Sequence, residues 1–334
     1  MKELLALLTG TYGPSGNEEP IRKVIEEEIK NYVDEIHTDV MGNLIAVKKG
    51  ASGSGKKVML AAHMDQIGLI VTNIDENGFL RFSNIGGVSP LNVIHRRVVF
   101  QDGVTGVVSY ESELEDIKNL KLNKMYIDIG AGSREDARKL VNIGDVAVYY
   151  APMACQENRY FGCAMDDRAG CAVLIETIKA VKNSPHELVF VFTVQEEVGL
   201  RGAKTAAYSI NPDLGIAVDV TLTGDTPKSR PMAVNLGAGP TVKVKDSSVI
   251  AHPKVKELMI RRAEEAGIPY QLEVLEAGGT DSGAIHLSRE GVPSGVISVP
   301  CRYVHSAHEM VDKNDMENAV KLLTFILENE INLG

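Results

Sequence analysis

The chain has 334 residues, of which 44% are hydrophobic and 24% are charged, ordinary values for a globular protein with room for two domains. The net charge of −10 and the absence of a long run of Lys or Arg argue against nucleic acid or an anionic membrane surface as a partner. No apolar segment reaches the roughly 20 residues that a membrane-spanning helix needs. Because we find no signal-peptide cleavage site and no C-x-x-C spacing among the cysteines, we expect a cytoplasmic protein with free thiols.

The N-terminal part predicts two helices, a loop and a buried strand. The helices fall within residues 4–36 and are separated by TYGPSGNEEP, in which Ser15 and Glu18 have capping-box spacing. Residues 47–57 (VKKGASGSGKK) predict a loop or hairpin turn, and residues 57–65 (KVMLAAHMD) predict a short buried strand.

Between residues 69 and 152 the pattern changes to β-branched and aromatic runs. Turn signals separate these runs, for example Asn77-Gly78 and Asp102-Gly103. Within this part only residues 133–141 look helical. We therefore expect a small β-rich domain over residues 69–152, inserted into a larger α/β domain made of residues 1–68 and 153–334.

After residue 160 strands and helices alternate. The predicted strands are residues 187–195, 214–220, 271–276 and 295–300, and the predicted helices are residues 166–181, 252–267, 281–291 and 313–331. This alternation predicts an α/β fold with a mostly parallel central sheet and helices on both faces. In such sheets ligands bind beyond the carboxyl ends of the strands.

Carboxylates and imidazoles gather at the ends of the predicted strands and just before the helix at residues 166–181. The set consists of His63, Asp65, Asp166, Asp167, Glu196, Glu197, Asp219, His305 and His308. Taken alone, several of these have plainer explanations: Asp166 suits an N-cap, His63 a hydrogen-bonded core histidine, and Asp219 a turn. Their shared position at one edge of the sheet favours a common site.

Adjacent carboxylates such as Glu196 and Glu197 repel each other, and burying them costs several kcal/mol unless positive charge lies nearby. Two divalent ions that share one carboxylate would supply this charge. Each ion would take one histidine, one terminal carboxylate and the shared carboxylate. One glutamate of the pair would then be a ligand, and its neighbour, which points the other way along an extended chain, would be a general base.

Six segments carry a family resemblance: HMDQIG (63–68), CAMDDRAG (163–170), QEEVGLRGA (195–203), VDV (218–220), AGGTDSGA (277–284) and YVHSAHEM (303–310). Together and in this order they resemble the tetrahedral-aminopeptidase family, whose members are di-metal leucyl and glutamyl aminopeptidases with an inserted PDZ-like β domain. Some members were also labelled as cellulases. The resemblance covers essentially the whole chain and implies a zinc-peptidase-like fold.

The resemblance also implies roles for single residues. One metal ion would be bound by His63, Asp166 and Asp219, and the other by Asp166, Glu197 and His308. Glu196 would be the general base, and Asp65 would orient His63 through its second ring nitrogen. His305 would be a local hydrogen-bonding residue. The loop of Gly279, Thr280 and Asp281 would border the substrate pocket. The ions would be zinc or cobalt, with manganese as a further candidate.

The implied function is a metal-dependent aminopeptidase that removes N-terminal residues from short peptides. The implied assembly is a homo-oligomer, a hollow tetrahedral particle of twelve subunits, with contacts supplied by the β-rich insert. Three alternatives remain: a metal-independent glycoside hydrolase with two carboxylates, an amino-acyl deacylase or carboxypeptidase on the same fold, and a non-catalytic binding or assembly protein. The preferred N-terminal side chain is not predicted, because the pocket residues lie in loops.

Overall fold

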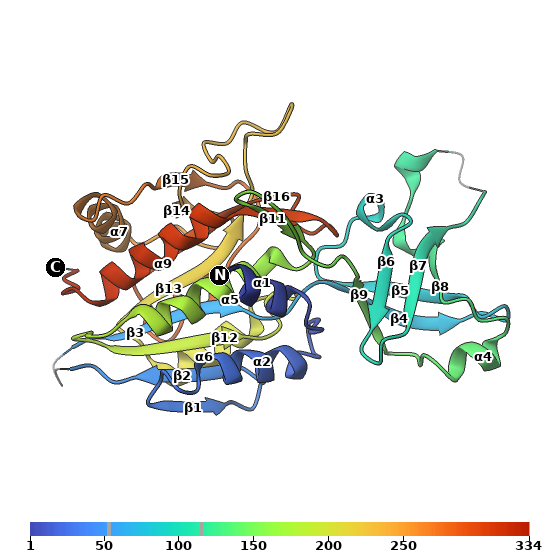
Figure 1. Cartoon of the computed structure of the whole chain (residues 1–334), viewed down its shortest axis with the longest axis horizontal. Helices are drawn as coiled ribbons and strands as arrows, with labels where there is room; N and C mark the ends of the chain where they lie inside the picture. Colours follow the sequence, from blue (N-terminus) through green and yellow to red (C-terminus); the bar gives the residue numbers. More distant parts are fainter. Residues whose placement is uncertain (52–54, 114–115, 334) are drawn as a thin grey trace.

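The computed structural model describes residues 1–51, 55–113 and 116–333, so the middle of the loop expected at residues 47–57 lies outside the described residues. Its body is built on an eleven-stranded sheet (Figure 1). The strands of this sheet are β1 (Glu35–Thr38), β2 (Leu44–Lys48), β3 (Lys57–His63), β10 (Ala154–Gln156), β11 (Arg159–Gly162), β12 (Glu187–Thr193), β13 (Leu214–Thr221), β14 (Thr241–Lys245), β15 (Gln271–Val274), β16 (Ser294–Arg302) and β17 (Glu309–Asp312).

The strands of this sheet are parallel at its centre and mostly antiparallel at its flanks. The order is β1-β2-β12-β3-β13-β16-β17-β11-β10, and β14 and β15 extend from β16. Neighbours from β12 to β16 pair in parallel, as do β14 and β15, whereas the other pairs are antiparallel. The prediction of a mostly parallel sheet is therefore wrong outside the centre. Short connections such as the one between β10 and β11 can only join antiparallel strands.

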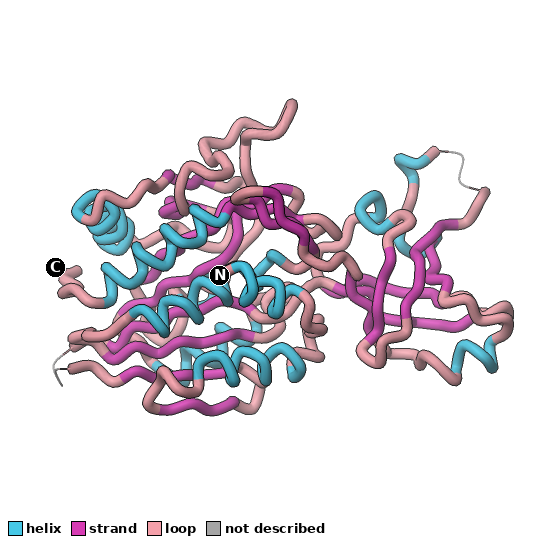
Figure 2. The backbone as a smooth tube through the Cα atoms, viewed as in Figure 1, coloured by secondary structure: helices cyan, strands magenta, loops and turns pink. Residues whose placement is uncertain are grey.

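Helices cover both faces of this sheet, as Figure 2 shows. They are α1 (Lys2–Thr9), α2 (Glu19–Ile29), α5 (Met165–Ala180), α6 (Arg201–Ile210), α7 (Pro253–Glu265), α8 (Ser282–Ile285) and α9 (Lys313–Leu327). Strand β12 contributes side chains to the hydrophobic cores on both faces of the sheet. Leu188, Phe190 and Phe192 belong to the core under α5 and α9, whereas Val189 and Val191 belong to the core under α6 and α8.

A closed barrel lies beside the body, in the order β4-β5-β8-β7-β6-β9. It contains β4 (Gly68–Ile74), β5 (Leu80–Ile85), β6 (Arg97–Phe100), β7 (Thr105–Tyr110), β8 (Met125–Asp128) and β9 (Val146–Tyr149), with α3 (Pro90–Val93), α4 (Arg134–Arg138) and the 3₁₀ turns Ile117–Asn119 and Leu122–Lys124. It has a hydrophobic cluster of its own, which includes Leu80, Val98 and Ile127. Closure removes the unpaired edges that an open six-stranded sheet would expose.

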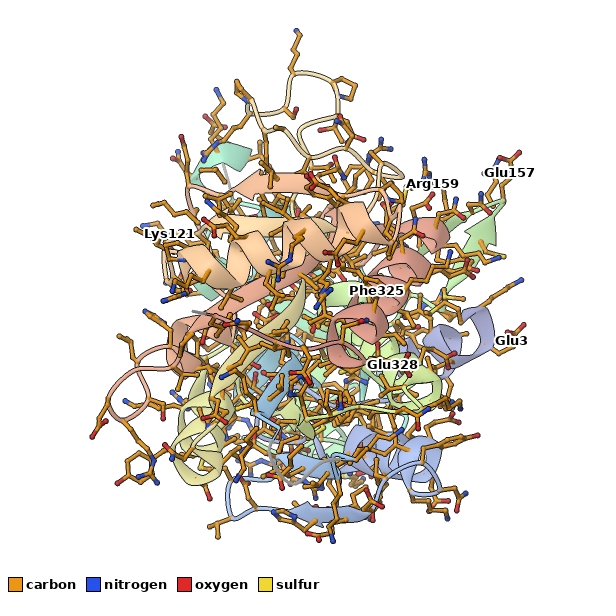
Figure 3. All side chains as sticks on the ribbon, turned by 90° about the vertical axis from the view of Figure 1, so that its left-hand side faces the viewer. Glu3, Lys121, Glu157, Arg159, Phe325 and Glu328 are labelled. Atoms are coloured by element: carbon orange, nitrogen blue, oxygen red, sulfur yellow. The ribbon has the colours of Figure 1, made fainter. Side chains whose placement is uncertain are left out.

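Charged side chains project from the surface of the body. Viewed from the left of Figure 1, Glu3 and Glu157 point outward, while Phe325 lies on α9 and Glu328 directly follows this helix (Figure 3). The guanidinium of Arg262 on α7 lies 5.8 Å from the centre of the Phe325 ring, which joins α7 to α9. Among the described residues, no helix has the length and apolar character needed to cross a membrane.

A buried arginine holds the N-terminal segment against the body. Arg168 on α5 is fully buried, and its guanidinium donates to the carbonyl oxygens of Leu8 at 2.8 Å, Thr11 at 3.3 Å and Gly13 at 3.3 Å. A Cβ on Gly13 would lie 2.9 Å from this guanidinium, so the close approach requires glycine. The anchored segment continues to Ser15, which reaches the functional site described below.

Replacement of Arg168 by Met should lower the free energy of unfolding by about 3 kcal/mol, because buried carbonyl groups lose charged donors. Equilibrium denaturation followed by circular dichroism measures this change. Arg138→Met is the matched control, since Arg138 is exposed on α4, and it should change stability by less than about 0.5 kcal/mol. Equal denaturation midpoints for the two variants would contradict the anchoring role.

Candidate metal centre

A cavity of about 480 Å³ lies at the carboxyl ends of β3, β12 and β13. Its wall contains most of the charged residues predicted from the sequence, namely His63, Asp166, Glu196, Glu197, Asp219 and His305. Each lies near or just beyond the carboxyl end of a strand, or at the start of α5. Parallel strands end at the same edge of a sheet, which brings these residues together. No described residue in this wall is Lys or Arg.

Asp166 lies between two imidazoles. Its Oδ1 is 3.0 Å from Nε2 of His63, and its Oδ2 is 3.2 Å from Nε2 of His305. The same Nε2 of His305 is 3.3 Å from Oε2 of Glu197. One carboxylate thus faces both histidines through different oxygens, which is the geometry expected of a shared ligand.

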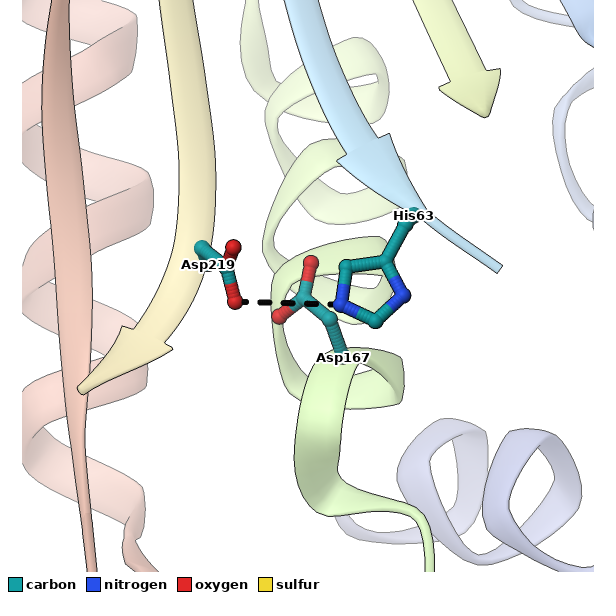
Figure 4. Close-up of side chains that lie close together, drawn as sticks. All are labelled: His63, Asp167 and Asp219. Atoms are coloured by element: carbon teal, nitrogen blue, oxygen red, sulfur yellow. Dashed lines mark ion pairs between the residues drawn. The ribbon is translucent and has the colours of Figure 1, made fainter. Parts of the chain in front are cut away.

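Asp219 and Glu196 approach the same ring nitrogen of His63 that faces Asp166. Asp219 Oδ1 and Glu196 Oε2 each lie 3.9 Å from His63 Nε2. Figure 4 shows Asp219 at the end of β13, Asp167 at the start of α5, and the ring of His63 turned toward both. Ligand atoms of His63, Asp167 and Asp219 lie within 4.8 Å of one another, and so do those of His63, Asp166 and Glu197.

Asp167 differs from Asp166 in its local role. Its Oδ1 accepts a hydrogen bond of 3.0 Å from the backbone N–H of Gly170 in the first turn of α5, as a helix-capping carboxylate does. Its Oδ2 is buried, and no atom in the part of the chain that the structure describes forms a hydrogen bond with it. Asp167 therefore both supports the helix start and leaves one oxygen within reach of a cation.

Asp65 holds the loop that carries the two glutamates. Its Oδ1 accepts the backbone N–H of Glu196 at 3.0 Å, and its Oδ2 accepts the N–H of Glu197 at 3.3 Å and the hydroxyl of Ser15 at 2.6 Å. Nδ1 of His63 lies 3.0 Å from the carbonyl oxygen of Asp65 and 3.7 Å from its carboxylate. The backbone carbonyl of Asp65 is thus the nearer group for orienting the ring.

The structure does not bring His308 to the cavity, so the predicted position of His308 is wrong. His308 is exposed and lies with His95 and Arg96 in a different pocket. His305 takes the place that we expected for it. The loop between β16 and β17 turns through positive φ angles at Tyr303 and His305, which directs the side chains of the two histidines to different sides. Spacing along the sequence does not reveal that turn.

Glu309 is a site residue that the sequence analysis missed. It is buried, its Oε1 accepts the backbone N–H of His305 at 2.7 Å, and its Oε2 accepts that of Asp166 at 3.1 Å. Burial, and then the charge of Asp166, raise its pKa to about 8. The available signal was an acid directly after the two histidines, at the start of β17.

The loop at residues 279–281 reaches the cavity only through glycine. Gly279 lines the wall, but Thr280 and Asp281 do not and are buried behind it. Asp281 accepts a hydrogen bond of 2.5 Å from the hydroxyl of Thr193. Thr193 is the register partner of His63 in the sheet. Asp281 thus supports the sheet beneath the site.

The pKa values of the clustered side chains show that the site lacks positive charge. Burial raises the pKa of Glu196 and of Asp219 well above the usual range. Burial alone would lower the pKa of His305, but hydrogen bonds to Asp166 and Glu197 raise it to about 12. The pKa of His63 is also raised well above its usual value, because nearby Glu196 and Asp166 outweigh its burial. The two imidazoles would thus hold protons that a metal ion would replace.

The donor set fits divalent metal ions. Imidazole nitrogens and carboxylate oxygens suit zinc, cobalt and manganese. Oε1 of Glu197 and Oδ2 of Asp167 are buried and have no hydrogen-bond partner among the described residues, which is costly unless a cation or water meets them.

The M42 glutamyl aminopeptidase family matches residues 42–322 of the chain. An Acetivibrio thermocellus protein that is named as an aminopeptidase is 60% identical to this chain over 323 residues, which are 97% of each chain. The lysyl aminopeptidase of Pyrococcus furiosus is 35% identical over 98% of this chain and 96% of its own.

Solved structures show the same fold. The aminopeptidase of Desulfurococcus kamchatkensis is 40% identical, with a TM-score of 0.95 over 98% of this chain and 94% of its own. The TET1 peptidase of Pyrococcus horikoshii, described as able to assemble into a tetrahedron or a large octahedral shell, is 35% identical with a TM-score of 0.86 over 98% of each chain. A Thermotoga maritima protein described as an endoglucanase is 33% identical with a TM-score of 0.83, over 97% and 96%.

These matches confirm the resemblance inferred from the six sequence segments. They cover nearly the whole chain, including the segments that carry the cavity residues. The chain therefore belongs to the M42 glutamyl aminopeptidase family, a family of hydrolases that act on peptides.

Proposed function

We propose that this chain is an aminopeptidase with two divalent metal ions, and that His63, Asp166 and Asp219 bind one ion while Asp166, Glu197 and His305 bind the other. The observation that carries this proposal is the position of Asp166, whose two oxygens face two different histidines at 3.0 Å and 3.2 Å. His305 replaces the ligand predicted from sequence, His308. Zinc, cobalt and manganese all suit these donors.

When bound, the ions would polarise the carbonyl of the first peptide bond and make water a stronger nucleophile. The chain supplies the proton transfer. Glu196 lines the cavity, and its backbone is held by Asp65 at 3.0 Å. Its side chain would take a proton from the attacking water and give it to the leaving amine. The burial that raises the pKa of Glu196 favours this exchange.

The charge of the cavity favours a substrate with a free amino group. Carboxylates outnumber imidazoles among the ionisable groups of its described wall, and no described lining residue is Lys or Arg. A substrate amine would be attracted to this wall, whereas a substrate carboxylate would find no cationic side chain to bind. This argues against a carboxypeptidase or an amino-acyl deacylase. A metal-independent glycoside hydrolase would leave His63 and His305 without a role.

The proposal also includes an oligomeric assembly, in which the barrel makes the subunit contacts. The Pyrococcus horikoshii peptidase described above forms tetrahedral and octahedral shells. We propose that this chain is likewise a homo-oligomer, as a tetrahedral dodecamer, in which a PDZ-like insert over residues 69–152 makes subunit contacts. A closed particle in the cytoplasm would restrict access to short unfolded peptides.

Glu196→Gln should keep both metal ions and lower kcat by a factor of about 10² to 10⁴, because the amide cannot accept the proton. Turnover of a panel of aminoacyl p-nitroanilides, together with elemental analysis of the dialysed protein, measures both properties. N-acetylated peptides are the substrate control and should not be cleaved. Retention of most of the activity would remove Glu196 as the general base.

His305→Ala should reduce the bound metal from about two ions per chain to about one, because one site loses its only nitrogen ligand. His308→Ala is the matched control three residues away, and it should bind as much metal as the unmodified protein. The ratio of metal to protein after dialysis distinguishes the two variants. Metal loss in His308→Ala alone would restore the original sequence prediction.

Treatment with EDTA should abolish turnover and lower the thermal unfolding midpoint, because the buried carboxylates then repel each other without compensation. Addition of zinc or cobalt should restore both. The Glu196→Gln variant, which lacks one of these carboxylates, should show a shift of the midpoint in the same direction on chelation, which separates metal binding from catalysis. A chelated protein that keeps full activity would exclude the metal mechanism.

A further inference from the structure

A second cavity, of about 460 Å³, lies where the barrel meets the body. We call it the junction pocket and define it by His95, Arg96, Arg97, Tyr150 and His308. His95 and Arg96 come from the turn between α3 and β6, and Arg97 is the first residue of β6. Tyr150 follows β9, and His308 precedes β17. The pocket thus joins three segments that are far apart in the sequence.

The charge of the junction pocket is opposite to that of the metal centre. Four of its lining residues are basic, and no described lining residue is Asp or Glu. Among the ion pairs formed within residues 1–51, 55–113 and 116–333, none involves His95, Arg96, Arg97 or His308. Elsewhere on the barrel, by contrast, Arg81 pairs with Glu111 at 2.8 Å.

Two of these basic groups lie close together. The pKa of His308 is lowered by its partial burial and then by the charge of the nearby Arg96. The guanidinium of Arg96 donates to the backbone carbonyl of Asn92 at 3.4 Å. Arg96 and Arg97 carry fixed positive charge, and two guanidinium groups in a cavity whose described lining has no carboxylate create a potential that attracts anions.

Aromatic rings and the backbone hold these groups in place. The guanidinium of Arg97 lies over the ring of Tyr150, 5.4 Å from its centre, and His95 stacks on Tyr110 with ring centres 6.2 Å apart. The backbone N–H of Tyr150 also donates to the carbonyl of Arg97 at 2.9 Å. Guanidinium groups held in this way present paired N–H donors that match the oxygens of phosphate or carboxylate.

We propose that the junction pocket binds a small oxyanion with at least two negative charges, such as phosphate or a dicarboxylate. The ligand would bridge the turn at His95–Arg97 and the loop at His308, and so fix the barrel against the body. The bridge lies next to the metal centre, since the side-chain amide of Asn92 donates to the carbonyl oxygen of His305 at 3.1 Å. Neither the catalytic roles nor the assembly proposed above depends on this site.

Orthophosphate and succinate are the probes, each titrated into the metal-loaded protein at constant ionic strength against chloride. The proposal expects the thermal unfolding midpoint to rise by about 3 °C or more at saturating probe. It also expects binding, measured by equilibrium dialysis, to weaken about tenfold or more in Arg96→Gln and in Arg97→Gln. A response to orthophosphate alone identifies a phosphate site, and a response to both identifies a general dianion site.

Arg138→Gln, an exposed arginine on α4, is the matched control and should bind the probes as the unmodified protein does. Binding that persists in the Arg96→Gln/Arg97→Gln double variant would place the anion elsewhere, for instance at the metal ions, and overturn the proposal. No response to either probe would overturn it as well. A change in particle mass of the double variant by light scattering would instead identify the occupant as a carboxylate of another copy.

Discussion

Repulsion among buried carboxylates is the constraint on which the metal centre depends. Asp166, Glu196, Glu197 and Asp219 converge on one cavity, and the described lining offers only two imidazoles as possible cations. At these distances and this burial, unpaired carboxylates either take up protons or require a metal. Burial, and then the charge of neighbouring carboxylates, raise the pKa of Glu196 and of Asp219. The surrounding carboxylates raise the pKa of His63 and of His305 against the effect of burial.

Two further acids, Asp65 and Glu309, make this arrangement possible. Their carboxylates accept hydrogen bonds from the backbone of the proposed site residues. Asp65 accepts the N–H groups of Glu196 and Glu197, and Glu309 accepts those of His305 and Asp166. Four site residues are thus fixed through their main chains, while their side-chain oxygens and nitrogens stay available to ions. A centre held in this way is preorganised before any metal binds, which is the condition for precise coordination.

Sequence reasoning could find the residues whose position follows from strand periodicity. His63, Glu197 and Asp219 were predictable, because the carboxyl ends of parallel strands must meet at one edge. It failed where a loop decides the direction of a side chain. His305 and His308 lie three residues apart in an irregular segment, and only the positive φ angles at Tyr303 and His305 determine which one enters the cavity. Glu309 was missed for a related reason, since the composition of a sequence does not show which carboxylates accept hydrogen bonds from the backbone.

Prediction of the fold from the sequence had similar limits. The alternation of strands and helices after residue 160 predicted a sheet with helices on both faces, and the structure has both. The parallel character was overestimated, because periodicity describes the faces of a strand and not the direction of its neighbour. That direction depends on connections such as the β10–β11 hairpin, whose short length forces an antiparallel pair.

The barrel takes part in the centre through two glycines. A Cβ on Gly86 would lie 3.0 Å from Oε2 of Glu197, and a Cβ on Gly87 would lie 2.5 Å from Nδ1 of His305. The absence of side chains there lets the barrel contact two proposed ligands directly. The same stretch of barrel continues to His95, while the loop from His305 continues to His308, so both segments run from the acidic centre to the basic junction pocket. A shift of the barrel against the body would therefore act on both sites, because each site contains residues of these two segments.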